Sequence, residues 1–136
     1  MALQLDVITP ERRLLSEQVD SVTVPGANGE LGILPGHTPL ISALQTGVLA
    51  YTQGASTRRL LVSGGFVEVN ADRVSVLADM AEFPEEVNAQ AARTERDEAE
   101  RRLGSFSGPP EEMAEVRTQL ERATARLQLA AENPAR

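Results

Sequence analysis

A change of composition near Pro84 most strongly constrains the fold of this chain. Before Pro84 the chain is rich in Val, Leu, Thr and Gly, and after it Ala, Glu, Arg and Gln dominate. Residues 1–84 contain nine acidic residues and five Arg, whereas the shorter segment 85–136 contains eleven acidic residues and eight Arg. Dense charge of mixed sign is typical of solvated helices. We therefore expect two parts, a β domain over residues 1–84 and a helical segment over residues 85–136.

Alternating apolar residues in the first part predict half-buried strands. Leu3, Leu5 and Val7 recur at every second position, and the same period occurs around residues 22–24, 66–69 and 73–76. Turn-forming residues separate these runs, at residues 25–29, 35–37, 53–54, 63–65 and 70–72. Many short strands with such spacing predict a sandwich or a barrel. A core of this size with few aromatic residues is small, so we expect the domain to lean on a partner surface.

Ser63-Gly64-Gly65 has two interpretations, a phosphate cradle or a tight turn. A phosphate-binding loop would continue with Lys and then Ser or Thr, and this chain lacks both at that place. We therefore expect a tight hairpin turn here.

The second part predicts two helices that form a hairpin. The first covers residues 85–103 and stops at Gly104, and the second starts at Pro109-Pro110 with acidic residues in its first turn. The second helix has an apolar seam at steps of three and four, made of Met113, Val116, Leu120, Ala123, Leu127 and Ala130. The matching stripe on the first helix is Val87, Ala92, Ala99 and Leu103. Because Ala buries little area, we expect a weakly held hairpin that is able to move.

Composition excludes several classes of function. The chain has 136 residues, a net charge of −7, no Cys and one His, and its 13 basic residues are all Arg. The absence of Cys excludes disulfides and thiol nucleophiles, and one His excludes a His-rich metal cluster. The negative charge disfavours nucleic acid, and no run is long enough for a membrane span. His37 has no recognisable nucleophile or orienting carboxylate, so we expect no catalytic residue, no metal and no cofactor.

Residues 29–40 read GELGILPGHTPL and resemble the GELGI-x-PGH-x-PL segment of the epsilon subunit of bacterial F-type ATP synthase. Residues 63–69, SGGFVEV, resemble the second landmark of that family, and residues 5–11, LDVITPE, resemble its opening strand. Residues 100–103 and 122–127 look like its two helices, so the resemblance covers essentially the whole chain. The fold that it implies is an N-terminal β-sandwich followed by a C-terminal α-helical hairpin, α+β overall.

The resemblance implies a non-catalytic rotor subunit of the central stalk of a proton-transporting ATP synthase. Residues 1–84 would bind the gamma subunit and the c-ring and couple them during ATP synthesis driven by a proton gradient. The hairpin, residues 85–136, would be regulatory, and in an extended form it would contact the catalytic beta and alpha subunits and inhibit ATP hydrolysis. Such a subunit lies peripherally at the cytoplasmic face of the bacterial inner membrane, which it reaches only through the complex.

Glu30, His37 and Pro10 are the candidate contacts with the c-ring or gamma, as the resemblance implies. Glu30 and His37 are short polar side chains that flank a stiff Pro-Gly turn. From the residue types alone, a contact with another subunit and a purely structural role in the turn have about equal weight.

Arg117, Arg122 and Arg126 on the second helix are the candidate regulatory contacts. Guanidinium groups pair with carboxylates in a bidentate manner, which suits docking on an acidic catalytic surface. The alternative is a solvated helix face with Glu115 and Glu121 as neighbours. The apolar seam likewise has two interpretations, as a partner-binding stripe or as packing within the hairpin.

The alternative function is a nucleotide-sensing module whose hairpin folds on binding ATP. ATP-binding members of the family carry an I/L-D-x-x-R-A motif, where this chain reads VNAQAA over residues 87–92. Asn88 replaces the acid and Ala91 replaces the Arg, although Arg122 and Arg126 match the arginines of the second helix. Loss of one charge-assisted contact costs roughly 1.5–3 kcal/mol, so we expect nucleotide binding to be weak or absent. A third interpretation, a hydrolase built on a β-sandwich, lacks a metal site, a thiol and a supported His.

Overall fold

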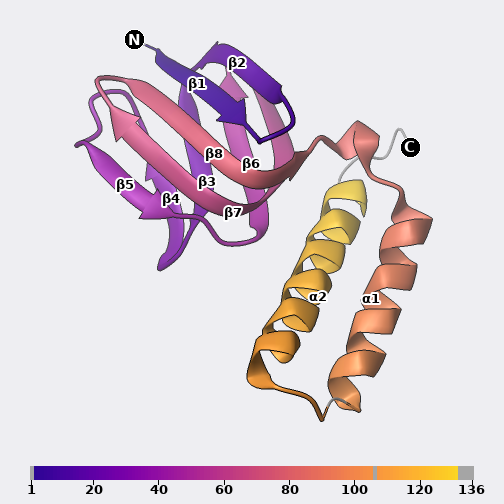
Figure 1. Cartoon of the computed structure of the whole chain (residues 1–136). Helices are drawn as coiled ribbons and strands as arrows, with labels where there is room; N and C mark the ends of the chain where they lie inside the picture. The colour runs from indigo at the N-terminus through magenta and orange to yellow at the C-terminus, as the bar shows by residue number, and fades with distance from the viewer. Residues whose placement is uncertain (1, 106, 132–136) are drawn as a thin grey trace. The chain divides into compact units, whose positions relative to one another are not determined.

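A computed structural model describes residues 2–105 and 107–131 (Figure 1). The contacts divide the chain into two compact units, Met1–Phe83 and Pro84–Arg136. Over the described residues, the first unit contains eight strands and the second contains one 3-10 turn and two α-helices. The predicted fold class, a β-sandwich followed by a helical hairpin, is confirmed.

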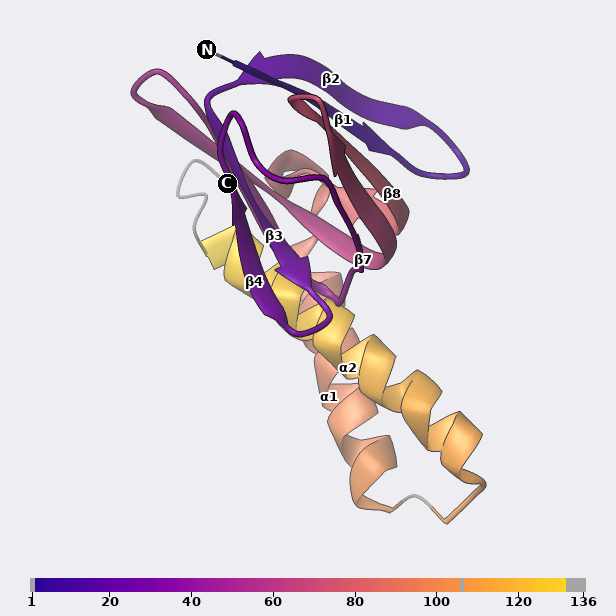
Figure 2. The ribbon, with the colours of Figure 1, turned by 90° about the vertical axis from the view of Figure 1, so that its left-hand side faces the viewer.

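The strands pair into one sheet that folds over itself. The strands of the described residues are β1 (Leu3–Ile8), β2 (Arg13–Val19), β3 (Ser21–Gly26), β4 (Gly29–Ile33), β5 (Leu40–Ala43), β6 (Gly47–Gln53), β7 (Ser56–Asn70) and β8 (Arg73–Glu82). Their order in the sheet is β2-β1-β8-β7-β6-β3-β4, and β5 pairs with β7. The β1–β2 and β3–β4 hairpins are therefore at opposite ends of the order, and Figure 2 shows them apart.

The predicted alternation places the core on the inner face of the folded sheet. β1 buries Leu3, Leu5 and Val7, and its intervening residues are half-buried. β3, β7 and β8 contribute further alternating positions, and together these residues form one apolar cluster. Its members on those three strands are Val22, Val24, Leu60, Val62, Val67, Val69, Val74, Val76, Ala78 and Ala81. The strands that alternation predicts are therefore present, and one of their faces forms the core.

The tight hairpin turn predicted at residues 63–65 is wrong. β7 runs through these residues without reversing, although Gly64 and Gly65 have φ of 71° and 93°. At this point the strand changes partner, because residues 56–62 pair with β6 and residues 66–69 pair with β5. The chain reverses instead at Ala71 and Asp72, whose φ values of 50° and 60° are typical of a two-residue hairpin loop.

The turn predicted over residues 25–29 is narrower in the structure. Pro25 and Gly26 belong to β3 and Gly29 begins β4, so only Ala27 and Asn28 connect the two strands. Pro25 pairs opposite Glu30 in this hairpin. The position of Glu30 on the ladder is therefore fixed.

The second unit is a helical hairpin that a short turn precedes. The turn η1 covers Pro84–Glu86, α1 covers Ala89–Gly104, and α2 covers Pro110–Ala131. Figures 1 and 2 both show α1 and α2 side by side. The first helix begins later than predicted, because Asn88 has extended backbone angles and its side chain accepts a hydrogen bond from the Ala91 amide at 2.9 Å. Asn88 is thus the N-cap, and residues 85–88 lie outside the helix.

Small side chains form the buried face of the hairpin. Ala92 and Ala99 of α1 and Val116 and Ala123 of α2 are buried, as the predicted stripes require. The remaining seam residues are only half-buried: Met113, Leu120, Leu127 and Ala130. Ala125 and Leu129 are buried although they lie off the seam. The buried face of α2 is therefore wider than the single seam that the spacing predicts.

Candidate functional site

A row of apolar side chains crosses the outer face of four strands. The register places Ile8 of β1 opposite Leu77 of β8, Leu77 opposite Phe66 of β7, and Phe66 opposite Ala43 of β5. Phe66 is 56% exposed and Leu77 is 52% exposed, and Ala43 is exposed as well. We call these four residues the apolar row. Adjacent strands lie about 4.8 Å apart, so the row spans roughly 14 Å. Contiguous exposed apolar surface marks interaction sites.

Carboxylates flank the apolar row on one side. The neighbouring positions on the same face are Asp6, Ser75, Glu68 and Ile41, which oppose one another in that order. Glu68 is exposed, and Ile41, at 69% exposure, extends the apolar surface along β5. The face therefore suits a partner that presents an apolar ridge with basic groups beside it.

The apolar row has a signal in the sequence, although the alternation that predicts the strands does not reveal it by itself. Phe66 and Leu77 stand at the positions that alternate with the core valines, where a half-buried strand normally carries polar residues. Two large apolar residues at positions of paired strands that point away from the core therefore indicate a second, exposed apolar surface.

Residues 34–37 between β4 and β5 form a type II turn, which we call the docking turn. The His37 amide donates to the Leu34 carbonyl at 3.1 Å, Pro35 occupies the second position, and Gly36 has φ of 84°. Leu34 is 63% exposed. The Gly36 amide donates to Asp72 Oδ1 at 2.7 Å, so the turn is attached to the β7–β8 hairpin.

The structure places the three candidate contacts of the first unit on three separate segments. Glu30 is exposed at the second position of β4, and His37 is half-buried in the docking turn, where its Nδ1 donates to the Thr38 carbonyl at 2.6 Å. Pro10 is exposed between β1 and β2, two residues beyond Ile8 of the apolar row. Pro10 therefore adjoins the apolar row in the chain, and His37 belongs to the docking turn.

The three arginines of α2 have different surroundings. Arg126 Nη1 lies 3.0 Å from Glu95 Oε2 of α1, and the Arg126 side chain is only 17% exposed. Arg122 is half-buried and Arg117 is exposed. A second polar contact between the helices joins Arg102 Nη1 to Gln119 Oε1 at 3.1 Å. Arg126 therefore stabilises the closed hairpin, whereas Arg117 faces solvent.

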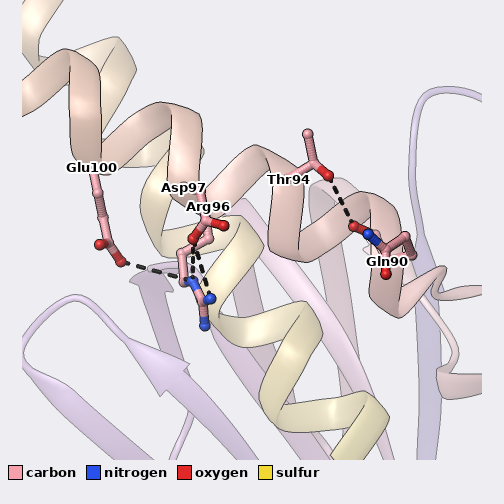
Figure 3. A network of polar contacts seen from close by, with 5 residues as sticks. All are labelled: Gln90, Thr94, Arg96, Asp97 and Glu100. Atoms are coloured by element: carbon pink, nitrogen blue, oxygen red, sulfur yellow. Dashed lines mark hydrogen bonds and ion pairs between the residues drawn. The ribbon is translucent and has the colours of Figure 1, made fainter.

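The outer face of α1 carries the mixed charge that the composition predicts (Figure 3). Arg96 contacts Asp97 at 3.2 Å and Glu100 at 3.8 Å, and the Thr94 hydroxyl donates to the Gln90 carbonyl at 3.2 Å. Exposed ion pairs of this kind contribute about 0–1 kcal/mol. This network belongs to a solvated helix face.

An open hollow of about 540 Å³ lies at the start of α1, lined by Glu86, Val87, Asn88, Ala89 and Ala130. None of these described lining residues is basic, and the Asn88 side chain is engaged by the Ala91 amide. A polyphosphate needs cationic or N–H donors, so the hollow is a poor match for a nucleotide.

Residues 2–105 and 107–131 contain neither a candidate metal site nor a candidate membrane-spanning helix. No group of three His, Asp or Glu side chains in these residues is arranged to hold a metal ion. In the same residues, no helix is both long and apolar enough to cross a membrane.

Known proteins resemble this chain in fold and in sequence. A chain in the cryo-EM structure of the Euglena gracilis mitochondrial ATP synthase superposes with a TM-score of 0.80 at 22% identity, over 99% of this chain and 82% of that one. Residues 2–84 match the family described as ATP synthase, Delta/Epsilon chain, beta-sandwich domain.

Full-length relatives extend the match into the hairpin. The ATP synthase epsilon chain of Nitratidesulfovibrio vulgaris (strain DP4) is 42% identical over 94% of this chain and 95% of its own length. That of Desulforamulus reducens is 47% identical over 75% of this chain and 77% of its own length. The chain therefore belongs to the family of ATP synthase epsilon chains, which are non-catalytic subunits of that complex.

Proposed function

We propose that this chain is the central-stalk subunit that couples gamma to the c-ring of a proton-transporting ATP synthase. The observation that carries the proposal is the apolar row, because its exposed Phe66 and Leu77 form a surface suited to burial against another subunit. The row is the proposed gamma contact, together with the adjoining Pro10. The docking turn with His37, and Glu30 of β4, are the proposed contacts with the polar loops of the c-ring.

The proposed location follows from these partners. A subunit held by gamma and the c-ring would lie peripherally at the cytoplasmic face of the bacterial inner membrane. Its net charge of −7 favours protein partners over the phosphate groups of nucleic acids.

Substitutions on the apolar row test the gamma contact. Phe66→Ser combined with Leu77→Ser should weaken binding of the full chain to purified gamma by roughly 10- to 150-fold. Full burial of each side chain contributes about 1.5–3 kcal/mol, and about half of each side chain is still exposed in the free protein. The matched control is Arg73→Ser, which lies on the same face two rows away. Thermal melts of all three proteins check the fold. Unchanged affinity of the double variant would show that gamma binds elsewhere.

The hairpin is the proposed regulatory element. Its Ala-rich interface favours the closed form only modestly, because small side chains bury little apolar area. An extended hairpin would present its apolar seam and Arg117, Arg122 and Arg126 to the catalytic beta and alpha subunits and restrain ATP hydrolysis. Of these three arginines, Arg117 is already exposed in the closed hairpin.

Weak ATP binding is expected for the isolated protein, against the alternative of a nucleotide sensor. Asn88 serves as a helix cap and Ala91 carries no charge, so α1 lacks both motif groups. Calorimetric titration with MgATP measures the affinity. A dissociation constant below about 100 μM, equivalent to roughly −5.5 kcal/mol, would favour the nucleotide-sensing function instead.

A further inference from the structure

We propose that Asp72 is a positioning residue that holds the docking turn in its binding conformation. The proposal rests on the proposed function, because the segment that Asp72 would hold in place is the segment that would meet the c-ring. Asp72 lies 36 residues from Gly36 in the chain, and the sequence analysis assigns it only to the turn-forming residues 70–72.

Asp72 links three segments of the first unit. Its Oδ1 accepts the Gly36 amide at 2.7 Å, and its backbone carbonyl accepts the Gln4 amide of β1 at 2.9 Å. Asp72 is half-buried and closes the β7–β8 hairpin with φ of 60°. The docking turn is therefore fixed to the strand pair that also carries Phe66 and Leu77 of the apolar row.

The geometry of a type II turn explains why Gly36 needs an external acceptor. The turn uses the amide of its fourth residue, here His37, for its own hydrogen bond. The amide of its third residue, Gly36, points outward and is free for another acceptor. A carboxylate is a strong acceptor for an amide donor, since ionised groups form shorter and stronger hydrogen bonds than neutral ones.

Fixing the turn lowers the entropic cost of docking. Ordering a loop on binding reduces affinity, and an interaction that orders the loop beforehand restores it. The turn presents Leu34, at 63% exposure, beside the half-buried His37. Without the Asp72 contact these side chains would sample several orientations before they met a partner.

The left-handed backbone of Asp72 allows a clean test. Asp72→Gly keeps φ of 60° accessible and removes the carboxylate, at the cost of added backbone freedom. Asp72→Asn retains an oxygen acceptor and is the conservative rescue. Ala71→Gly is the matched control, because Ala71 is the other left-handed residue of the same loop, with φ of 50°.

The first readout is hydrogen exchange of the Gly36 amide in the full-length protein. Asp72→Gly should accelerate exchange of this amide by about tenfold, whereas Ala71→Gly and Asp72→Asn should stay within about threefold of wild type. Equal exchange rates in Asp72→Gly and Ala71→Gly would overturn the proposal.

The second readout is binding of each full-length protein to ATP synthase membranes that have been stripped of this subunit. Asp72→Gly should bind about three- to tenfold more weakly than Ala71→Gly, and Asp72→Asn should recover most of the affinity. Faster Gly36 exchange without loss of affinity would overturn the positioning role. If wild type itself failed to bind, the proposed function would fail, while the exchange experiment would still test the Asp72 contact.

Discussion

Gly65 allows β7 to continue past the point where the strand changes partners. A side chain at this position would overlap the Leu77 carbonyl oxygen of β8, and φ of 93° is unfavourable for any residue with a Cβ. The glycine therefore serves the close pairing of β7 with β8, which also brings Phe66 opposite Leu77.

Gly65→Ala should destabilise the protein by about 3 kcal/mol or more, because it combines backbone strain with a clash against backbone. Gly54→Ala is the matched control, since Gly54 has φ of 60° but, among the described residues beyond its chain neighbours, no atom lies within 4 Å of the position that a Cβ would occupy. It should cost only about 1–2 kcal/mol. Urea denaturation of the full chain measures both. A similar loss in the two variants would show that φ alone determines the requirement for glycine at residue 65.

Single residues show where sequence reasoning succeeds and where it stops. The alternation of Leu3, Leu5 and Val7 is a local signal, and it correctly identified β1. The Gly64-Gly65 pair correctly signals unusual backbone angles, but the same signal fits a turn or a bent strand, and only the pairing of β7 decides between them. The contact between Asp72 and Gly36 depends on tertiary structure, so no spacing rule could reveal it.

At the scale of elements, the ion pair between Glu95 and Arg126 is a partly buried contact that joins α1 to α2. Its Arg126 side chain is 17% exposed and its Glu95 side chain 38% exposed, so solvent screens the pair only in part. Pairs with this exposure contribute about 1 kcal/mol. Because the buried face of the hairpin is mostly Ala and buries little apolar area, we expect that contribution to matter for closing the hairpin.

Glu95→Arg should open the hairpin, and the double variant Glu95→Arg with Arg126→Glu should close it again. Like charges at 3.0 Å replace an attraction by a repulsion, and the swap restores the attraction. Spin labels on Cys introduced at Gln90 and Gln128 report the separation of the helices. Arg96→Glu is the control, because Arg96 pairs with neighbours on its own helix. Failure of the double variant to close the hairpin would show that the pair does not hold the helices together.

The helix positions were predictable, whereas the extent of the buried face was not. Pro110 and the acids after it indicate the start of α2, and Gly104 indicates the end of α1. A single seam at steps of three and four leaves out Ala125 and Leu129, which lie one turn apart beside it. Their burial depends on which neighbours surround the helix, and periodicity along one helix contains no information about them.

For the whole molecule, the two units suggest a division between binding and regulation. The apolar row and the docking turn lie within Met1–Phe83, while the hairpin begins at Pro84. We therefore expect the first unit to couple gamma to the c-ring without the hairpin. Proton pumping by membranes reconstituted with the shortened chain should persist, and normal assembly with uncoupled ATP hydrolysis would contradict this division.

Deletion of residues 85–136 should also raise steady-state ATP hydrolysis by the complex, because it removes the hairpin whose extended form we propose restrains the catalytic subunits. Substitution of Arg126 is a weaker test of the regulatory role, because Arg126 contacts Glu95 in the closed hairpin. Its loss would change the free energies of both the closed and the extended form. Arg117 is exposed, so Arg117→Ala should raise hydrolysis by weakening the extended form alone. If the two forms differ by a few kcal/mol, loss of a contact worth about 1.4 kcal/mol shifts their ratio tenfold.

The assay is hydrolysis at low nucleotide concentration, with Arg96→Ala on the solvated face of α1 as the control. An unchanged rate after deletion would mean that the hairpin of this protein has no regulatory role.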